Sequence, residues 1–371
     1  MSGWKGHADT ALEIMAADRF LIGLFSLNAS GGIAMTTVPE RWRAGWEEAL
    51  AVAQLADQVG LDFLLPLQRW RGYGGKSDPR GVCMETMTHT AALAGFTRRI
   101  ALFTTAQTSI LHPTWAARAV ATIDHASGGR VGLNIVCGWN EHDFAMFNAE
   151  DVGVEQRYDQ GEEWAIIFSR QIRGEPPFDF RGKYLSVKGA YCLPASIQPE
   201  GPPLISAAFS PPGRAFAAKY CDILFTTISS IDNAARHTAS IKDEAATHQR
   251  SIRVITPLHV ICRSSTAEAQ AYYHHYAVEH GDDGAVENYI AENARSGKPA
   301  LAAAMRMQKK RIAGGFGSFG IAGSPRDIAD QIIELKRAGL DGVSLSFVNF
   351  RDELPYFLEA VMPLLESAGL R

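Results

Sequence analysis

Polar residues interrupt two apolar runs of the sequence, at places where they could meet a bound molecule. Asn134 stands inside the run at residues 130–137, and Thr104 and Thr105 lie near the end of the run at residues 99–106. A buried amide without a hydrogen-bond partner costs roughly 1 to 3 kcal/mol, so Asn134 needs a ligand or a neighbouring threonine beside it. Because threonine is common in strands, a purely structural role for the two threonines is the alternative.

The segment QRWRGYGG follows the apolar run at residues 62–67 and combines two arginines, two aromatic residues and flexible backbone. It begins with Gln68, Arg69 and Trp70. Guanidinium groups bind anions and stack on rings, and aromatic side chains bury flat surfaces. The segment therefore favours a planar, partly anionic ligand.

Two further segments have the composition of ligand-binding loops. The segment SPPGR, which begins at Ser210, is typical of a helix start, where free backbone N–H groups and the helix dipole attract phosphate. The segment NASGG, which begins at Asn28, is either a turn that requires glycine or a loop that faces a substrate.

Short apolar runs alternate with helical patterns along the chain, which indicates repeated βα units, a parallel sheet and the α/β class. Eight runs match the number of strands in a closed (βα)8 TIM barrel, whose active site lies where the strands end and the following loops begin. The predicted strands are residues 20–27, 62–67, 99–106, 130–137, 203–209, 222–227, 253–262 and 342–347.

Helical patterns occupy the intervals between these runs. Trp42, Trp46 and Ala49 recur with the spacing of one buried helix face. Ser324 followed by Asp327 predicts a helix that begins with a capping box.

Residues 266–318 break the alternation and predict a helical insertion before the last βα unit. The basic run at residues 309–311 is either a solvated helix end or part of a mobile lid over residues 309–320, where glycines flank an aromatic residue. His274 and His275 lie in a polar helical pattern and are interpreted as surface residues. No metal site is expected.

The composition is that of a soluble enzyme, and a single domain over residues 1–371 is expected. The 36 Lys and Arg residues against 40 Asp and Glu residues give a net charge of −4, which does not favour nucleic acid as a partner. Five scattered cysteines indicate reduced thiols. Without an apolar segment of signal or membrane-spanning type, we expect a cytoplasmic protein with no membrane partner.

The segment ATIDHASGGR at residues 121–130, with VGLNIVCGW at residues 131–139, resembles the centre of the luciferase-like flavin-dependent monooxygenases. Similar segments cover nearly the whole chain, including FRGKY at residues 180–184 and the stretch at residues 323–347. The resemblance is closest to the branch that contains the pyrimidine, dimethylsulfone and dibenzothiophene-sulfone monooxygenases. It implies a TIM barrel of the bacterial-luciferase type that binds reduced FMN.

The resemblance also implies where the cofactor lies. Gln68 and Arg69 would lie against the flavin ring, and Asn134 and Asp143 would contact the isoalloxazine or the ribityl chain. The residues implied to hold the ribityl phosphate are Arg157, Tyr158 and Ser210.

Thr105 and Asn134 correspond to the pair that lines the pocket where oxygen meets reduced flavin in the pyrimidine branch, and they are the predicted catalytic residues. Asn28, Trp70 and Trp139 are the predicted residues of the substrate pocket, where aromatic walls favour a planar or apolar molecule.

The sequence departs from the family pattern in two places. Where relatives have a glycine-rich phosphate turn, this chain has AFSPP at residues 208–212, and each proline removes a backbone donor. Asp143 stands where the pyrimidine branch has glutamate. The identity of the substrate therefore does not follow from the resemblance to the pyrimidine or the sulfone monooxygenases.

The resulting hypothesis is an FMNH2-dependent two-component monooxygenase. It would use O2 to oxidise a nitrogen heterocycle or amide, or a sulfone or sulfonate, through a flavin-peroxide. A separate NAD(P)H:flavin reductase would supply the reduced FMN, because the chain has no dinucleotide-binding fingerprint. The family implies a homodimer or homotetramer.

Two alternatives use the same barrel. One is a deazaflavin-dependent oxidoreductase that transfers hydride. The other is a non-catalytic flavin-binding protein, because a fold by itself does not establish an activity.

Overall fold

Eight parallel strands close into a barrel in the computed structural model, which describes residues 9–138, 140–295 and 299–371. Each run predicted from the sequence overlaps one of these strands, so the predicted TIM barrel is confirmed. The barrel strands are β1 (Leu21–Phe25), β2 (Phe63–Leu65), β3 (Ala101–Gln107), β4 (Val131–Val136), β7 (Leu204–Ala207), β8 (Ile223–Phe225), β9 (Arg253–Cys262) and β11 (Gly342–Ser346).

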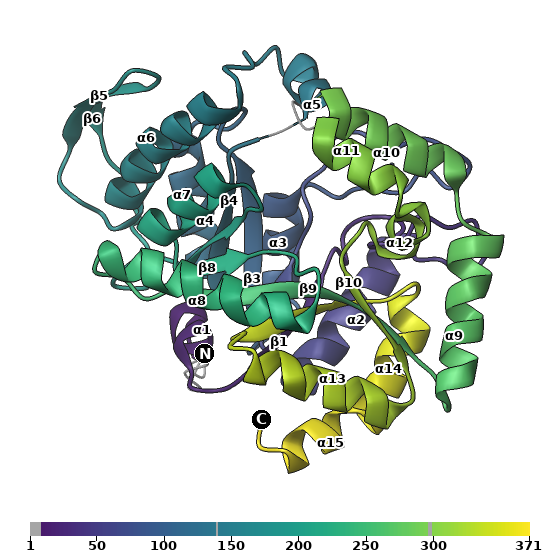
Figure 1. Ribbon diagram of the computed structural model, residues 1–371. Helices are drawn as coiled ribbons and strands as arrows, with labels where there is room; N and C mark the ends of the chain where they lie inside the picture. The colour runs from purple at the N-terminus through teal and green to yellow at the C-terminus, as the bar shows by residue number, and fades with distance from the viewer. Residues whose placement is uncertain (1–8, 139, 296–298) are drawn as a thin grey trace.

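The strands follow one another around the barrel in the order of the chain (Figure 1). The circle closes because β9 pairs with both β8 and β11, and β11 pairs with β1. All of these pairings are parallel, so the carboxyl ends of the strands meet at one end of the barrel. In the pairing of β3 with β4, Thr105 stands opposite Asn134.

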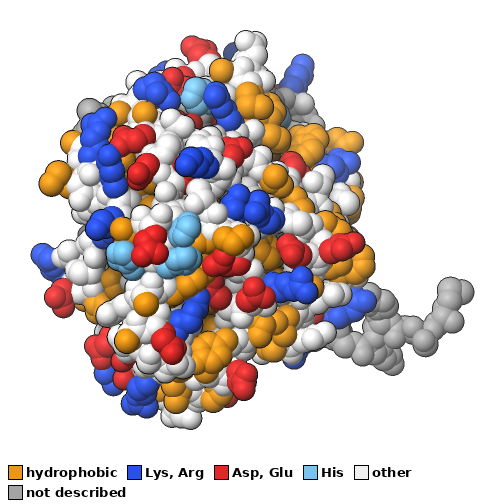
Figure 2. All heavy atoms as spheres, turned by 90° about the vertical axis from the view of Figure 1, so that its right-hand side faces the viewer, with side chains coloured by type: hydrophobic (Ala, Val, Ile, Leu, Met, Phe, Trp, Pro, Cys, Tyr) orange, Lys and Arg blue, Asp and Glu red, His pale blue; other side chains and the backbone are white. Residues whose placement is uncertain are grey.

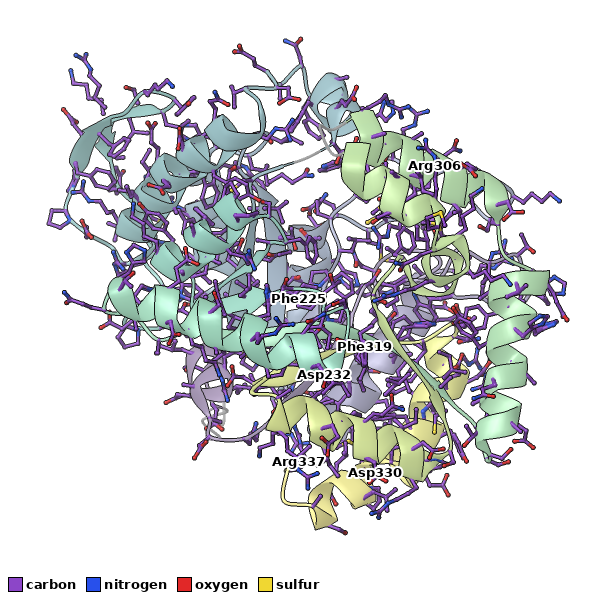
Figure 3. The ribbon with its side chains drawn as sticks, in the orientation of Figure 1. Phe225, Asp232, Arg306, Phe319, Asp330 and Arg337 are labelled. Carbon is purple, nitrogen blue, oxygen red and sulfur yellow. The ribbon has the colours of Figure 1, made fainter. Side chains whose placement is uncertain are left out.

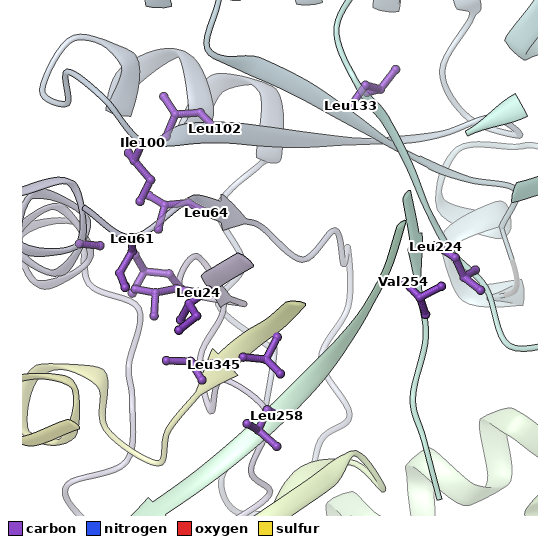
Figure 4. Close-up of a cluster of buried hydrophobic side chains, with 14 of the residues drawn as sticks. Leu24, Leu61, Leu64, Ile100, Leu102, Leu133, Leu224, Val254, Leu258 and Leu345 are labelled. Atoms are coloured by element: carbon purple, nitrogen blue, oxygen red, sulfur yellow. The ribbon is translucent and has the colours of Figure 1, made fainter. Parts of the chain in front are cut away.

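Alternate strand residues face the inside and the outside of the barrel. Large inward side chains, such as Phe63, Phe103 and Phe225, fill the interior. Outward leucines, such as Leu102 and Leu133, pack against the surrounding helices (Figure 4). The barrel is thus a packed core, and its chemistry has to lie at the open end.

Helix α1 (Ala11–Ala16) covers the opposite, amino-terminal end of the barrel. Its first backbone N–H donates to Gly129 O, just before β4 begins, and Ile14 and Met15 join the interior cluster. Thr10 and Glu13 form a capping box at its start.

A layer of helices surrounds the barrel (Figure 1). The predicted capping box of Ser324 and Asp327 is confirmed at the start of α13. Trp42 precedes α2 and is not part of it, although it is buried and packs edge-on against Phe350. The helices of this layer are α2 (Trp46–Gln58), α3 (Thr86–Ala94), α4 (Pro113–Ser127), α6 (Val154–Ile172), α7 (Pro211–Tyr220), α8 (Ile231–Thr247), α13 (Pro325–Arg337), α14 (Phe350–Ala360) and α15 (Met362–Ser367).

The predicted helical insertion is also confirmed. It contains α9 (Thr266–His274), a π-helical turn η1 (His275–Glu279), α10 (Asp283–Arg295), α11 (Pro299–Arg306) and α12 (Lys309–Gly315). A strand that the sequence analysis did not predict, β10 (Phe319–Gly323), follows it and pairs with the second half of β9.

Two smaller elements lie beyond the barrel strands. Helix α5 (Glu141–Met146) follows β4, and the hairpin of β5 (Phe178–Arg181) and β6 (Ser186–Ala190) stands at the edge of the molecule (Figure 1). The family-like segment FRGKY falls in this hairpin. Among the described residues, no helix is long and apolar enough to span a lipid bilayer.

Candidate active site

Thr105 and Asn134 meet at the carboxyl end of the barrel. Asn134 Nδ2 lies 3.2 Å from Thr105 Oγ1, and the Thr105 hydroxyl lies 3.1 Å from Pro66 O. Both side chains are buried, and Asn134 Oδ1 has no hydrogen-bond partner among the described residues. One side of this amide is therefore satisfied by the protein, and the other is open to a ligand.

Gln107 lies two residues beyond Thr105 on the same face of β3 and connects two predicted site residues. Its amide nitrogen Nε2 donates to Asp143 Oδ2 at 3.1 Å, and its Oε1 accepts from Trp70 Nε1 at 3.0 Å. The sequence analysis missed Gln107, although its place at the end of an apolar run was a usable signal. Trp70 also packs on Phe147, with ring centroids 4.7 Å apart.

Asp143 is a buried carboxyl with an open oxygen. Burial raises its pKa above the usual range, although Arg69 and the hydrogen bond from Gln107 act in the opposite direction. Asp143 Oδ1 is buried without a hydrogen-bond partner among the described residues. It can therefore accept a hydrogen bond from a ligand or, when protonated, donate one.

Arg69 is held by the insertion. Its Nη2 donates to both carboxylate oxygens of Glu292, at 2.9 and 2.7 Å, and its Nε donates to Arg71 O. The guanidinium also lies over the ring of Tyr73, 4.3 Å from the ring centroid. Glu292 belongs to α10, more than two hundred residues away in sequence, so no local spacing could have revealed this pair.

Gln68 is connected to the same region through Thr86. The Thr86 hydroxyl lies 2.8 Å from Gln68 Oε1 and accepts a hydrogen bond from the backbone N–H of Thr105. Four predicted residues, Gln68, Arg69, Thr105 and Asn134, thus lie at the ends of three adjacent strands.

The residues predicted to hold phosphate form a second group. Tyr158 Oη lies 3.3 Å from Ser210 Oγ, and Ser210 caps the start of α7 by accepting from Gly213 N–H. The guanidinium of Arg157 lies 5.0 Å from the ring centroid of Phe144, which follows Asp143 in α5. Helix α5 therefore connects the two groups.

Arg157 already has an ionic partner. Its Nε and Nη2 donate to the carboxylate of Asp151, and although burial acts the other way, these bonds lower the pKa of Asp151 below its usual range. The Asp151 side chain is 39% exposed, whereas that of Arg157 is 6% exposed. A phosphate at this place has to share Arg157 with Asp151 or displace it.

The predicted substrate residues have different surroundings. Asn28 is fully buried; its Nδ2 donates to Leu67 O and Met84 O, and its Oδ1 accepts from Leu67 N–H. These contacts join the loops after β1 and β2, which favours a positioning role. Trp70 is partly exposed beside Gln107, and Trp139 lies outside the described residues.

A cavity of about 410 Å³ lies between β9, β10 and the insertion. Its wall includes His259, Arg311 and Ser318 together with the apolar Ile261 and Phe319, the last of which is labelled in Figure 3. Burial lowers the pKa of His259 to about 3, so its imidazole is neutral at physiological pH. The sequence analysis did not single out His259 or Ser318.

The basic run at residues 309–311 is divided by the structure. Lys309 and Lys310 are exposed, and Lys309 forms an ion pair with Glu287. Arg311 is half-buried and donates to Ser318 O and Ile228 O. The two lysines thus lie at a solvated helix end, whereas Arg311 belongs to the cavity wall. A mobile lid over residues 309–320 stays a prediction.

A flavin fits the polar groups at the barrel mouth. Asn134 and Asp143 each carry a buried oxygen without a partner among the described residues, and Arg69 supplies a buried positive charge beside them. At the other group, Arg157 and the start of α7 supply positive potential, reduced by Asp151 and by the two prolines. The groups at the barrel mouth therefore suit a planar, polar ring well, whereas the group around Arg157 is less well suited to a phosphate.

A closed parallel barrel with polar groups gathered at its carboxyl end defines a TIM-barrel enzyme. Residues 21–342 match the family described as luciferase-like monooxygenase, and the chain therefore belongs to that family. The predicted class of enzyme, a flavin-dependent monooxygenase, agrees with this assignment.

A relative of similar sequence supports the assignment, and solved structures have a similar fold. The chain is 29% identical over 356 residues to pyrimidine monooxygenase RutA of Enterobacter sp. (strain 638), and the match covers 93% of this chain and 96% of the relative. Riboflavin lyase RcaE has a similar fold, with a TM-score of 0.85, 21% identity and coverage of 95% of this chain and 92% of that one. DmoA from Hyphomicrobium sulfonivorans is similar with a TM-score of 0.82, 18% identity and coverage of 95% and 88%.

Proposed function

We propose that this protein is the oxygenase of a two-component system that oxidises a small organic substrate with O2. Reduced FMN, delivered by a separate NAD(P)H:flavin reductase, would supply the electrons for oxygen activation. The observation that carries the proposal is the buried pair of Thr105 and Asn134, 3.2 Å apart, with Asn134 Oδ1 still open. A homodimer or homotetramer is part of the same proposal.

The residues at the barrel mouth would hold the flavin ring. Gln68 and Arg69 come from the loop after β2, and Asn134 and Asp143 supply the two open oxygens. The two hydrogen bonds from Arg69 Nη2 to Glu292 fix the guanidinium before any ligand binds, which lowers the cost of ordering it on binding. Arg157, Tyr158 and Ser210 would hold the phosphate.

Thr105 and Asn134 would act by position and by polarity. Both are neutral, so they can hold a small polar reactant by hydrogen bonds without donating a proton to it at neutral pH. Their burial at the top of a packed interior excludes bulk water from the reacting atoms. Asn28 would position the loops on either side of this place.

The cavity of about 410 Å³ supports a compact, polar substrate. Among the described residues, Arg311 forms no ion pair with an aspartate or glutamate, and it lines the cavity with neutral His259 and with Ser318. A guanidinium and a hydroxyl suit the oxygen atoms of an amide, a nitrogen heterocycle, a sulfone or a sulfonate. Trp70 and Trp139 are the proposed aromatic residues of a substrate pocket at the barrel mouth, and Trp70 is not among the residues that line this cavity.

The test is anaerobic titration with reduced FMN, followed by rapid mixing with O2 while the flavin absorbance is recorded. We expect the wild-type protein to bind reduced FMN and to reoxidise it in a slow phase that free FMN does not show. In Asn134→Ala this phase should become about 100-fold faster or disappear, because a preorganised polar group of this kind contributes about two orders of magnitude to rates.

Thr104→Val is the matched control. Thr104 is a neighbour of Thr105 but faces the helices, so its substitution should leave the slow phase unchanged. Reoxidation identical to that of free FMN in the wild type would reject the oxygenase. Failure to bind reduced FMN would direct the next titration to a deazaflavin and its hydride transfer.

A further inference from the structure

A single π-helical turn brings two histidines together on the outer face of the insertion. The backbone N–H of His280 donates to His275 O at 3.0 Å, which is the bond between residues five apart that defines such a turn. Residues five apart point in different directions on an α-helix, whereas a π-turn places them on one side. The rings of His275 and His280 accordingly lie with centroids 4.5 Å apart.

Glu279 lies beside these rings and completes a cluster. Its Oε2 is 3.1 Å from His275 Nδ1, and its Oε1 is 3.2 Å from Nδ1 of the neighbouring His274. The ligand atoms of His275, Glu279 and His280 all lie within 4.8 Å of one another. Figure 2 shows histidine side chains gathered around acidic ones on this face of the molecule.

The backbone of the turn is held in place from the inside. The Thr36 hydroxyl donates to Tyr276 O at 2.7 Å, and Thr37 N–H donates to His280 O at 2.8 Å. At Gly281 an added Cβ would lie 2.6 Å from Ala277 O, so glycine is required for the close return of the chain. The turn is thus fixed by contacts that do not involve the three side chains of the cluster.

We propose that His275, Glu279 and His280 form a binding site for a borderline transition-metal ion, with Zn²⁺ as the best match. Imidazole nitrogens favour zinc and its neighbours over Ca²⁺ and Mg²⁺, and a carboxylate is a common third ligand. Zinc bonds of about 2.1 Å place ligand atoms about 3.4 Å apart in a tetrahedron, so side-chain rotation on the fixed turn is enough to close the site. Water would occupy the remaining position.

The inner side of the same turn contacts two residues that line the cavity between β9, β10 and the insertion. Tyr276 is fully buried; its hydroxyl donates to Gly314 O at 2.9 Å and lies 3.1 Å from His259 Nε2. Gly314 and His259 both line the cavity. A metal ion on the outer side should therefore slow amide exchange at residues 275–281, next to the cavity wall.

The test is calorimetric titration of the tag-free full-length protein with ZnCl2, together with Co²⁺ absorption as a second measurement. We expect one equivalent to bind to the wild type, with the d–d bands of a tetrahedral site when Co²⁺ is used. The double variant His275→Ala/His280→Ala should bind at least about 100-fold more weakly, and Glu279→Gln about tenfold more weakly.

His248→Ala is the matched control, because His248 is an exposed histidine at the end of α8, outside the cluster. It should bind Zn²⁺ as the wild type does. Equal affinities in the wild type and the double variant would overturn the site, as would the absence of saturable binding to the wild type. This experiment needs no flavin, so its outcome is independent of the proposed oxygenase.

Discussion

If Arg157 holds the flavin phosphate as proposed, its ion pair with Asp151 would set how strongly the phosphate binds. Asp151 is partly exposed and occupies the guanidinium that a phosphate would use. We expect Asp151→Asn to bind FMN about two- to fivefold more tightly, because the competing ion pair is worth less than about 1 kcal/mol at such exposure. Fluorescence titration with FMN measures this change.

Asp159→Asn is a suitable control, since Asp159 is exposed on α6, the helix that contains Arg157, and its replacement changes the net charge equally. An equal gain in both variants would show a general charge effect. Weaker binding in Asp151→Asn would show that the carboxylate positions Arg157 for the ligand.

Glu353 is a buried acid whose charge destabilises the folded state. Burial raises the pKa of Glu353 to about 7, although Arg263 lies beside it with its Nη1 3.3 Å from Glu353 Oε2. The folded state therefore binds a proton that the unfolded state releases between about pH 4.5 and pH 7. This contribution to the free energy of unfolding is most favourable below pH 4.5 and decreases as the pH rises to 7.

We expect Glu353→Gln to remove this dependence, so that its free energy of unfolding relative to the wild type rises between pH 5 and pH 7.5, by on the order of 2 kcal/mol. Urea unfolding at several pH values measures the change. Glu359→Gln, at an exposed position of the same helix, should follow the wild type. Parallel curves for wild type and Glu353→Gln would contradict the argument.

At the scale of elements, α10 of the insertion fixes the loop after β2. Glu292 binds Arg69 through two hydrogen bonds and accepts a third from Asn140 Nδ2, so one side chain joins the insertion to the loops after two barrel strands. Breaking a buried ion pair leaves an uncompensated charge, which costs about 3 to 5 kcal/mol.

We expect Glu292→Gln to lower the free energy of unfolding by up to this amount and to speed amide exchange at residues 68–75. Hydrogen exchange with mass spectrometry measures the second effect. Glu287 also lies on α10, and it forms an exposed ion pair with Lys309 of α12. Glu287→Gln should change the free energy of unfolding by less than about 1 kcal/mol. Unchanged exchange at residues 68–75 in Glu292→Gln would show that the loop is held by other contacts.

The segment that most resembles the family has a structural role at this scale. Asp124 accepts hydrogen bonds from Ser196, Ile197 and Gln198, and Arg130 donates to the backbone of Ala94, Thr97, Ile100 and Ser127. These contacts fix the start of β4 and so determine where Asn134 lies.

At the scale of the whole molecule, the packed interior of the barrel gives a rigid base for the open end. Gly132 of β4 faces the ring of Phe103, and an added Cβ would lie 2.4 Å from that ring. We expect Gly132→Ala to lower the free energy of unfolding by about 1 to 3 kcal/mol, because the surrounding interior cannot yield without strain. Thermal or urea unfolding measures it.

Gly45→Ala is the matched control, since the nearest atom to its added Cβ is a flexible carboxylate oxygen of Glu48 at 3.6 Å and its φ is −62°. Its stability should stay within about 0.5 kcal/mol of the wild type. Equal effects of the two substitutions would contradict the role assigned to the interior.

The sequence by itself determined the eight strands, the insertion and the catalytic candidates. Apolar runs of strand length follow from burial on both faces of a parallel sheet, a local pattern that can be read without coordinates. The resemblance to the pyrimidine branch implied the pair of Thr105 and Asn134, and their places on consecutive strands agree with it, because residues near the ends of such strands meet at one end of the barrel.

Only the tertiary structure decided which further residues contact the predicted ones. Glu292 reaches Arg69, Asp151 forms an ion pair with Arg157, and a π-turn gathers His275 and His280, none of which follows from a regular helical or strand period. The first contact depends on where the insertion returns over the barrel mouth, and the other two depend on irregular backbone between nearby residues. A contact between residues more than two hundred positions apart leaves no periodic pattern in the sequence. The strands that support the site do leave one, because apolar runs of strand length recur along the chain.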